Sequence, residues 1–260
     1  MTFWRLFKAS YAGAFAFIIA CPLLALVPVV FEMLQHIVEV HIGMYDSAAA
    51  AQAVAQDPAR MTFGLLKVMA LTVPGYWVTR FLAYRDPARA ARMESPAVGL
   101  FALFFVAQIA IAIVQLFLLP QSSAAQLGGF AAGLVIGALL AAWGVAAPLG
   151  DRTIGPRASV AIMARQTLWT IVFSLAAIMP LMIPHYLFAA MAILGSRQLL
   201  WPVLAVDAAL VGVLSPVMMA AAYHAVLRAT DRAGVTIRPS GLAGDHGLTP
   251  YARHPASSRT

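Results

Sequence analysis

Glutamate and histidine side chains near the end of the first apolar stretch could bind a metal ion or carry protons. Glu32, His36 and Glu39 are spaced i, i+4 and i+7, so a helix would present all three on one face. Carboxylate and imidazole ligands suit zinc, manganese or iron, and the same groups can relay protons. His185 lies in the outer half of a later apolar stretch, where a compact bundle would let it approach them. The alternative is a solvated helix end with acidic residues, because no His-Glu-x-x-His sequence accompanies the set.

Two opposite charges lie inside the apolar stretches at matching depth. Lys67 stands six residues after Met61, and Asp207 stands six residues after Trp201. Both therefore lie ~9 Å inside the outer membrane boundary, at a rise of about 1.5 Å per residue. A lone charge in the membrane costs several kcal/mol, so we expect a Lys67–Asp207 ion pair that closes the bundle near its outer face. The alternative is that Lys67 extends to the headgroups and Asp207 is protonated.

Six apolar stretches, each long enough to cross a bilayer, must position these side chains. About 20 apolar residues span a hydrocarbon core of about 30 Å. The stretches are Tyr11–Leu34, Met61–Tyr84, Ala97–Leu119, Leu127–Pro148, Leu168–Ile193 and Leu199–Ala225. With 62% hydrophobic and 10% charged residues, the chain has a composition that a soluble domain could not bury. The predicted fold is an all-α, polytopic bundle of six transmembrane helices.

Basic residues gather on alternate connections and so predict the orientation. They precede the first stretch, fill the second and fourth connections and follow the last stretch, whereas the opposite side holds only Arg60 and Arg197. The positive-inside rule then predicts that both termini are cytoplasmic. Arginine greatly outnumbers lysine and alanine is abundant, which is typical of GC-rich bacteria. We therefore expect a bacterial inner (plasma) membrane protein whose net charge of +7 meets anionic headgroups, with no nucleic acid as partner.

The start of the chain admits a second interpretation. Arg5 and Lys8 precede an apolar run that reaches Cys21, which loosely resembles a lipoprotein signal with its cleavage site. Pro22 follows the cysteine directly and the apolar run continues, so we favour an uncleaved anchor.

The chain is expected to form one helical bundle followed by one tail. Residues 1–233 are expected to form the six-span domain, and residues 234–260 a disordered cytoplasmic tail, because the tail is polar and rich in glycine and proline. Short helices are predicted at Ser47–Ala55, Arg85–Met93 and Arg157–Arg165, and Phe3–Lys8 is expected to form an interfacial element of the same kind before the first span. Lipid headgroup contact is predicted for a set of arginines around the second connection, namely Arg80, Arg85, Arg89 and Arg92.

Glycines and prolines within the spans are expected to affect how the helices pack and bend. Gly129, Gly133 and Gly137 follow four-residue spacing, which favours close helix packing within the bundle or between copies in a homo-oligomer. Prolines interrupt the stretches at positions 22, 28, 74, 180, 184 and 216. Each either forms part of a broken helix around a binding cavity, as in transporters, or is an ordinary kink.

The sequence is compatible with three functions. No phosphate-binding glycine loop, dinucleotide fingerprint or nucleophile elbow occurs, so we expect no enzyme and no cofactor, with a metal ion as the one candidate. The first expectation is an accessory or scaffold protein that binds other membrane proteins. The alternatives are a small-solute or ion permease with a site near Lys67, Asp207 and His185, and a periplasm-facing metal-dependent enzyme that uses Glu32, His36, Glu39 and His185.

Overall fold

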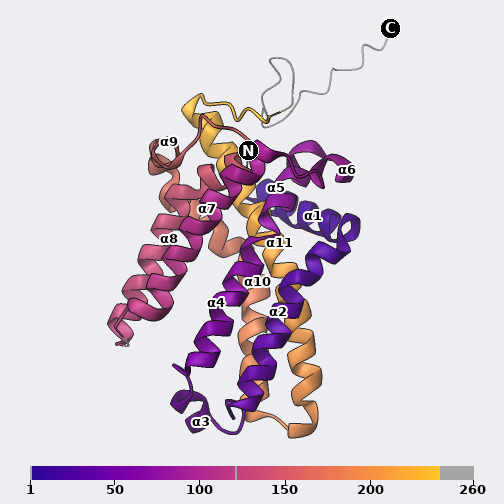
Figure 1. The fold of residues 1–260 in the computed structure, drawn as a ribbon, viewed down its shortest axis with the longest axis vertical. Helices are drawn as coiled ribbons and strands as arrows, with labels where there is room; N and C mark the ends of the chain where they lie inside the picture. Colours follow the sequence, from indigo (N-terminus) through magenta and orange to yellow (C-terminus); the bar gives the residue numbers. More distant parts are fainter. Residues whose placement is uncertain (1, 121, 241–260) are drawn as a thin grey trace.

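A computed structural model describes residues 2–120 and 122–240, and within these ranges the chain is helical without strands (Figure 1). The α-helices are α1 (Phe3–Ala20), α2 (Pro22–His41), α3 (Ala48–Ala53), α4 (Pro58–Thr72), α5 (Gly75–Tyr84), α6 (Pro87–Ala90), α7 (Ser95–Ile113), α8 (Ser123–Ala146), α9 (Pro156–Met163), α10 (Thr167–Leu194) and α11 (Leu200–Ala233). A π-helical turn, Val114–Leu118, extends α7. Six segments are long and apolar enough to cross a membrane: α2, α4 with α5, α7, α8, α9 with α10, and α11. The all-α, six-span prediction is therefore confirmed.

The spans alternate in direction, which gives the bundle two distinct ends. The connection that carries α3 lies at one end together with the α10–α11 connection, and α6 and α9 lie at the other (Figure 1). We call these the α3 end and the α6 end. The described chain begins and ends at the α6 end.

The first span differs from the predicted Tyr11–Leu34. α1 ends at Ala20, Cys21 has non-helical backbone angles (φ −135°, ψ 56°), and α2 begins at Pro22. Proline suits the first position of a helix because its missing N–H would have no partner there. A hydrophobic run alone does not reveal this break, since both helices are apolar. The first membrane span is therefore α2, and α1 is a separate helix.

Helix α1 crosses other helices near the α6 end. Its Phe3 ring contacts Phe173 of α10, with ring centroids 5.3 Å apart. Further along, the Phe17 ring lies 5.9 Å from that of Phe81 on α5. The exposed side of α1 carries basic and large apolar residues, Trp4, Arg5, Lys8, Phe15 and Ile19. That composition is typical of a helix that lies at a membrane surface.

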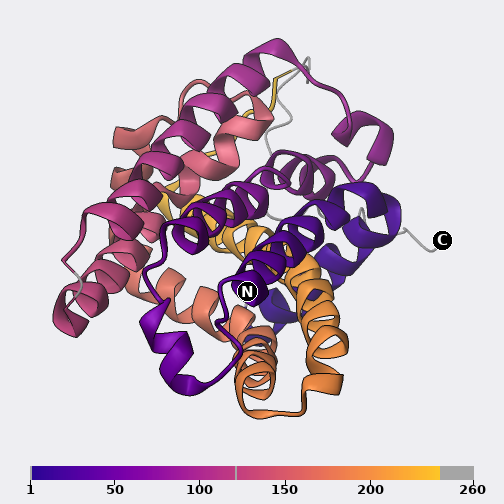
Figure 2. The ribbon, with the colours of Figure 1, turned by 60° about the horizontal axis from the view of Figure 1, so that its bottom comes forward.

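Helix α11 forms the centre of the bundle. In its most apolar stretch 61% of the residues are buried, against at most 33% in any other span. α1, α2, α5 and α10 all pack against it. The α7–α8 hairpin lies to one side, and its connection points away from α2, α10 and α11 (Figures 1 and 2).

Prolines lie within or between the helices of three spans. Pro74 separates α4 from α5, Pro28 lies within α2, and Pro216 lies within α11. The break at Pro74 leaves the carbonyl of Leu71 without its helical partner, and the Ser215 hydroxyl of α11 donates a hydrogen bond to it at 2.9 Å. A neighbouring hydroxyl is one of the few partners available to a backbone carbonyl inside a bilayer.

The arginines of the second connection do not share one environment. Arg85 and Arg92 are exposed and Arg89 is half-buried, as headgroup contact requires. Arg80, by contrast, is fully buried, so its predicted contact with lipid headgroups is corrected. Its guanidinium donates to the carbonyl of Pro148 at 3.1 Å and to the Glu94 carboxylate at 3.0 Å. It also donates to the carbonyls of Arg89 and Ala90. Arg80 thus ties the α5–α7 connection to the end of α8.

The start of the predicted disordered tail packs against the α6 end. Ile237 is fully buried, the Arg238 N–H donates to Asp151 at 2.7 Å, and the Ser240 N–H donates to the Leu149 carbonyl at 2.8 Å. The packed chain therefore extends past residue 234 to residue 240. Residues 241–260 lie outside the described part of the chain.

The three glycines of α8 have different neighbours. Gly129 lies against the Leu119 side chain, and Gly133 lies against Gln115 in the π-helical turn. Gly137 has open space where a side chain would begin. Close approach of the two helices of the hairpin thus involves the first two glycines, while Gly137 faces a cavity.

Candidate functional site

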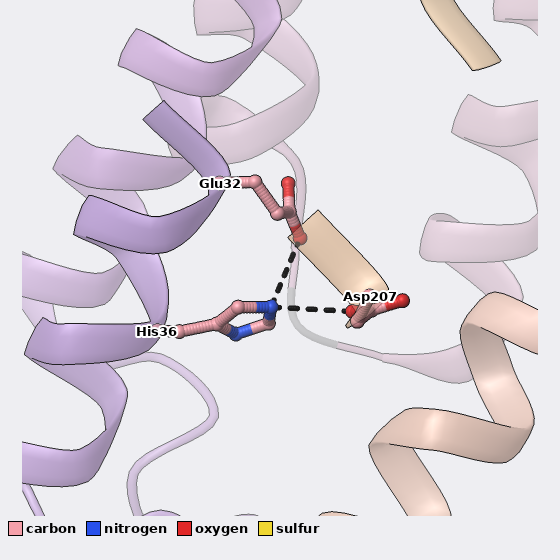
Figure 3. A group of neighbouring side chains, drawn as sticks. All are labelled: Glu32, His36 and Asp207. Atoms are coloured by element: carbon pink, nitrogen blue, oxygen red, sulfur yellow. Dashed lines mark hydrogen bonds and ion pairs between the residues drawn. The ribbon is translucent and has the colours of Figure 1, made fainter. Parts of the chain in front are cut away.

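Ionisable side chains from four spans meet in the half of the bundle nearer the α3 end. Glu32, His36 and Glu39 lie on one buried face of α2, as their spacing predicts. Asp207 comes from α11 and is 1% exposed. Figure 3 shows Glu32 and His36 pointing from α2 toward Asp207. His185 of α10 and Lys67 of α4 complete the group.

Asp207 lies between two imidazole rings. His185 Nδ1 is 2.7 Å from Asp207 Oδ1, and His36 Nε2 is 3.2 Å from Asp207 Oδ2. Each carboxylate oxygen of Asp207 therefore accepts a hydrogen bond from a different helix. With Asp207 ionised, the two histidine nitrogens that face the carboxylate each carry a proton.

The surroundings of His36 favour its doubly protonated form. Its Nδ1 atom lies 3.2 Å from Glu39 Oε2 and 3.0 Å from the Tyr45 hydroxyl oxygen. The Tyr45 hydroxyl already donates its own proton to Glu39 at 2.6 Å, so it acts as an acceptor toward His36. With Glu39 and Asp207 ionised, both ring nitrogens of His36 face acceptors, a pattern that an imidazolium satisfies.

Lys67 pairs with Glu32, which corrects the predicted Lys67–Asp207 ion pair. Lys67 Nζ lies 2.7 Å from the Glu32 carboxylate, and Glu32 is 1% exposed. α4 packs beside α2, so Lys67 reaches the carboxylate of that neighbour, while the partners of Asp207 are the two histidines. His36 Nε2 is also 3.6 Å from Glu32 and links the two carboxylates.

Glu39 closes the cluster toward the α3 end. It accepts hydrogen bonds from Gln35 at 2.9 Å and from Arg60 at 3.1 Å, in addition to that from Tyr45. Burial, together with the neighbouring Glu39 carboxylate, raises the pKa of the Tyr45 phenol well above its usual value. The phenol therefore keeps its proton and remains a donor to Glu39.

The charges of this cluster balance when His36 is protonated. With His185 neutral, three carboxylates face three cations: Glu32, Glu39 and Asp207 against Lys67, Arg60 and the His36 imidazolium. Buried charges are tolerated in a membrane when they are paired in this way. Loss of the His36 proton would then leave one uncompensated negative charge in the bundle. Release and uptake of this proton would therefore change the net charge of the cluster.

The same cluster offers a donor set for a metal ion. Ligand atoms of Glu32, His36 and Asp207 all lie within 4.8 Å of one another. Zinc bonds of about 2.0–2.1 Å separate tetrahedral ligands by roughly 3.3 Å, close to the observed spacing around His36 Nε2. His36 Nδ1 faces Glu39, the kind of carboxylate that commonly orients a metal-binding histidine. The Lys67 ammonium, however, already forms an ion pair with the Glu32 carboxylate and would compete with a metal cation for it.

Several members of the cluster were not predicted from the sequence. Gln35 shares the face of Glu32, His36 and Glu39 and could have been found by the same spacing. Arg60 is one of two basic residues on its side of the membrane, which is a weak signal. Tyr45 lies in a connection and carries no pattern that would bring it to the site.

Comparisons with known protein families, with curated proteins and with solved structures found no match. The functional argument therefore rests on the residues of this chain.

Proposed function

We propose that this multi-pass membrane protein is a proton-linked permease for a small solute or ion, with its proton site at Asp207, His36 and His185. The observation that carries the proposal is the Asp207 carboxylate between two imidazoles from two other spans. Histidine exchanges protons near neutral pH, and a buried carboxylate beside it makes that exchange electrically significant. Ionisable groups inside membrane spans commonly mark ion pathways and proton relays.

Prolines in the same helices support a moving site. Pro28 precedes Glu32 by one turn of α2, and Pro184 directly precedes His185 on α10. Pro74 follows the end of the helix that carries Lys67, and Pro216 lies inside the continuous helix of Asp207. Interrupted helices at ion and substrate sites are a recurring feature of transporters. A change in the cluster's charge would then act on helices that can bend.

We further propose a bacterial inner-membrane location with both termini and the α6 end in the cytoplasm, because the basic residues gather there. The accessory or scaffold role, with a homo-oligomer or another membrane protein as partner, stays a prediction. It would not require the charged residues of the cluster to exchange a proton.

A step in pH on a supported membrane tests the permease directly. Proteoliposomes adsorbed on a sensor should give a transient current when the buffer is stepped from alkaline to mildly acidic, because protons enter a site inside the membrane. Asp207→Asn should abolish the transient, whereas Asp231→Asn, at the exposed end of the same helix, should keep it. His36→Gln serves as a second variant. Equal transients in the wild type and both cluster variants would refute the proposal, and a panel of added solutes that converts the transient to a sustained current would identify the cargo.

The second candidate is a divalent-cation site, favoured by the donor spacing of Glu32, His36 and Asp207. Metal content and Zn²⁺ or Mn²⁺ binding of the purified protein test it. Binding that is lost in His36→Ala and kept in His41→Ala, an exposed histidine of the same helix, would support a metal-linked function. Equal binding by both variants would reject it.

A further inference from the structure

A separate cavity of about 340 Å³ lies between the α7–α8 hairpin and the rest of the bundle. Residues of α4, α5, α7, α8, α10 and α11 line it. A second hollow of about 290 Å³ adjoins it, since the two share lining residues, Thr72, Gln108, Gly133, Leu134 and Gly137. None of the charged cluster residues lines either space, so this cavity is distinct from the proton site.

The two spaces form an elongated path within the membrane. Their lining on α8 extends from Phe130 to Val145, a distance of about 22 Å at a rise of about 1.5 Å per residue. The volume of the first space alone lies in the range of about 300–1,000 Å³ found for small-molecule sites. An elongated space of this kind suits a linear molecule.

The path opens sideways toward lipid. Phe130 and Ile136 line the second hollow, and their side chains are 60% and 38% exposed on a membrane span. The surface of a span that is exposed in the bundle faces hydrocarbon chains in the bilayer. A molecule dissolved in the bilayer can therefore enter without crossing water.

The lining is mostly apolar, with one polar group that lacks a partner. Thr170 on α10 is 3% exposed, and its hydroxyl has no hydrogen-bond partner among the described residues. A buried hydroxyl without a partner is costly, so a polar group on an occupant would be stabilised there. Thr170 lies at the α6 end of the path, opposite the hollow beside Phe130.

We propose that this path binds a free fatty acid, with its alkyl chain along α8 and its carboxyl group at Thr170. The single chain fits the elongated space, the sideways opening admits a membrane-dissolved molecule, and the carboxyl supplies the acceptor that the Thr170 hydroxyl lacks. The site is independent of the proton cluster, so either can fail without the other.

Photolabelling tests the proposal in the intact protein. The protein is reconstituted in phospholipid nanodiscs, irradiated with a diazirine-bearing fatty acid, and the labelled peptides are mapped by mass spectrometry. We expect label on α8 and α10 residues that line the path, and loss of that label on addition of unlabelled fatty acid. Label spread evenly over exposed surfaces, or label that resists competition, would overturn the proposal.

Two glycines of α8 supply a matched pair of variants. Both Gly137 and Gly128 have open space where a side chain would begin, but only Gly137 lines the path. Gly137→Leu should fill the path and reduce labelling at least tenfold, while Gly128→Leu should leave it unchanged. Thr170→Val removes the hydroxyl without changing the shape and should weaken competition by unlabelled fatty acid about fivefold. Equal labelling of both glycine variants would contradict the site, and stronger competition by a phospholipid than by the fatty acid would contradict the ligand.

Discussion

Replacement of Lys67 by methionine should destabilise the protein through Glu32. The Lys67 ammonium is 2.7 Å from a carboxylate whose side chain is 1% exposed, so its removal leaves a buried charge without its main partner. Breaking a buried ion pair in this way costs about 3–5 kcal/mol. The Lys67 side chain is 20% exposed and His36 remains 3.6 Å from Glu32, which argues for the lower end, about 3 kcal/mol.

A double-mutant cycle distinguishes the Lys67–Glu32 pair of the structure from the Lys67–Asp207 pair that membrane depth alone predicts. Unfolding in mixed micelles, followed by tryptophan fluorescence, would be measured for Lys67→Met, Glu32→Gln, Asp207→Asn and the two doubles that include Lys67→Met. We expect Glu32→Gln to recover about 2–3 kcal/mol of the loss, because it removes the unpaired charge. Asp207→Asn, combined with Lys67→Met, should recover much less of the lost free energy of unfolding. A larger recovery with Asp207→Asn than with Glu32→Gln would refute the assigned pairing.

Three further predictions concern the α6 end. Arg80→Ala should destabilise the protein by about 3–5 kcal/mol, since it leaves buried carbonyls and Glu94 unpaired, whereas Arg85→Ala on the exposed surface should have little effect in the same unfolding assay. Burial alone would raise the pKa of Glu94, but the hydrogen bond and charge of Arg80 outweigh it and lower that pKa. Glu94 therefore stabilises the fold above the ordinary glutamate pKa, and this contribution should disappear as the pH falls through the lowered value. A Glu94→Gln variant with the same melting-temperature profile in acid as the wild type would contradict this. Ile237→Ala should cost about 2–5 kcal/mol, and an unchanged melting temperature would mean that residues 235–240 do not pack as described.

The number and type of the spans could be predicted because hydrophobic length alone determines them. Helix α1 could not, because the Cys21–Pro22 break lies inside a continuous apolar run. The signal that distinguishes α1 is its exposed side, where Arg5 and Lys8 accompany large apolar residues. A hydropathy window averages over that pattern.

The face of α2 in the charged cluster could be predicted, but its partners could not. Spacing fixes which residues share a helix face, so Glu32, His36 and Glu39 were found together. Depth in the membrane matched Lys67 with Asp207, yet it says nothing of which helices are neighbours. Because α4 packs beside α2, Lys67 meets Glu32. Sequence likewise predicts lipid contact for Arg80, because a basic residue near a connection carries no sign of the backbone carbonyls that surround it in the fold.

A measurement of the protonation state of His36 is the most direct test of the proposed proton site. Nitrogen-15 NMR of histidine-labelled protein in bilayers distinguishes an imidazolium from the two neutral tautomers, and His36→Gln identifies the signal. We expect both ring nitrogens to carry protons in neutral buffer and Asp207→Asn to alter this signal. A neutral His36 with one unprotonated nitrogen would contradict the charge balance of the cluster and the proton site built on it.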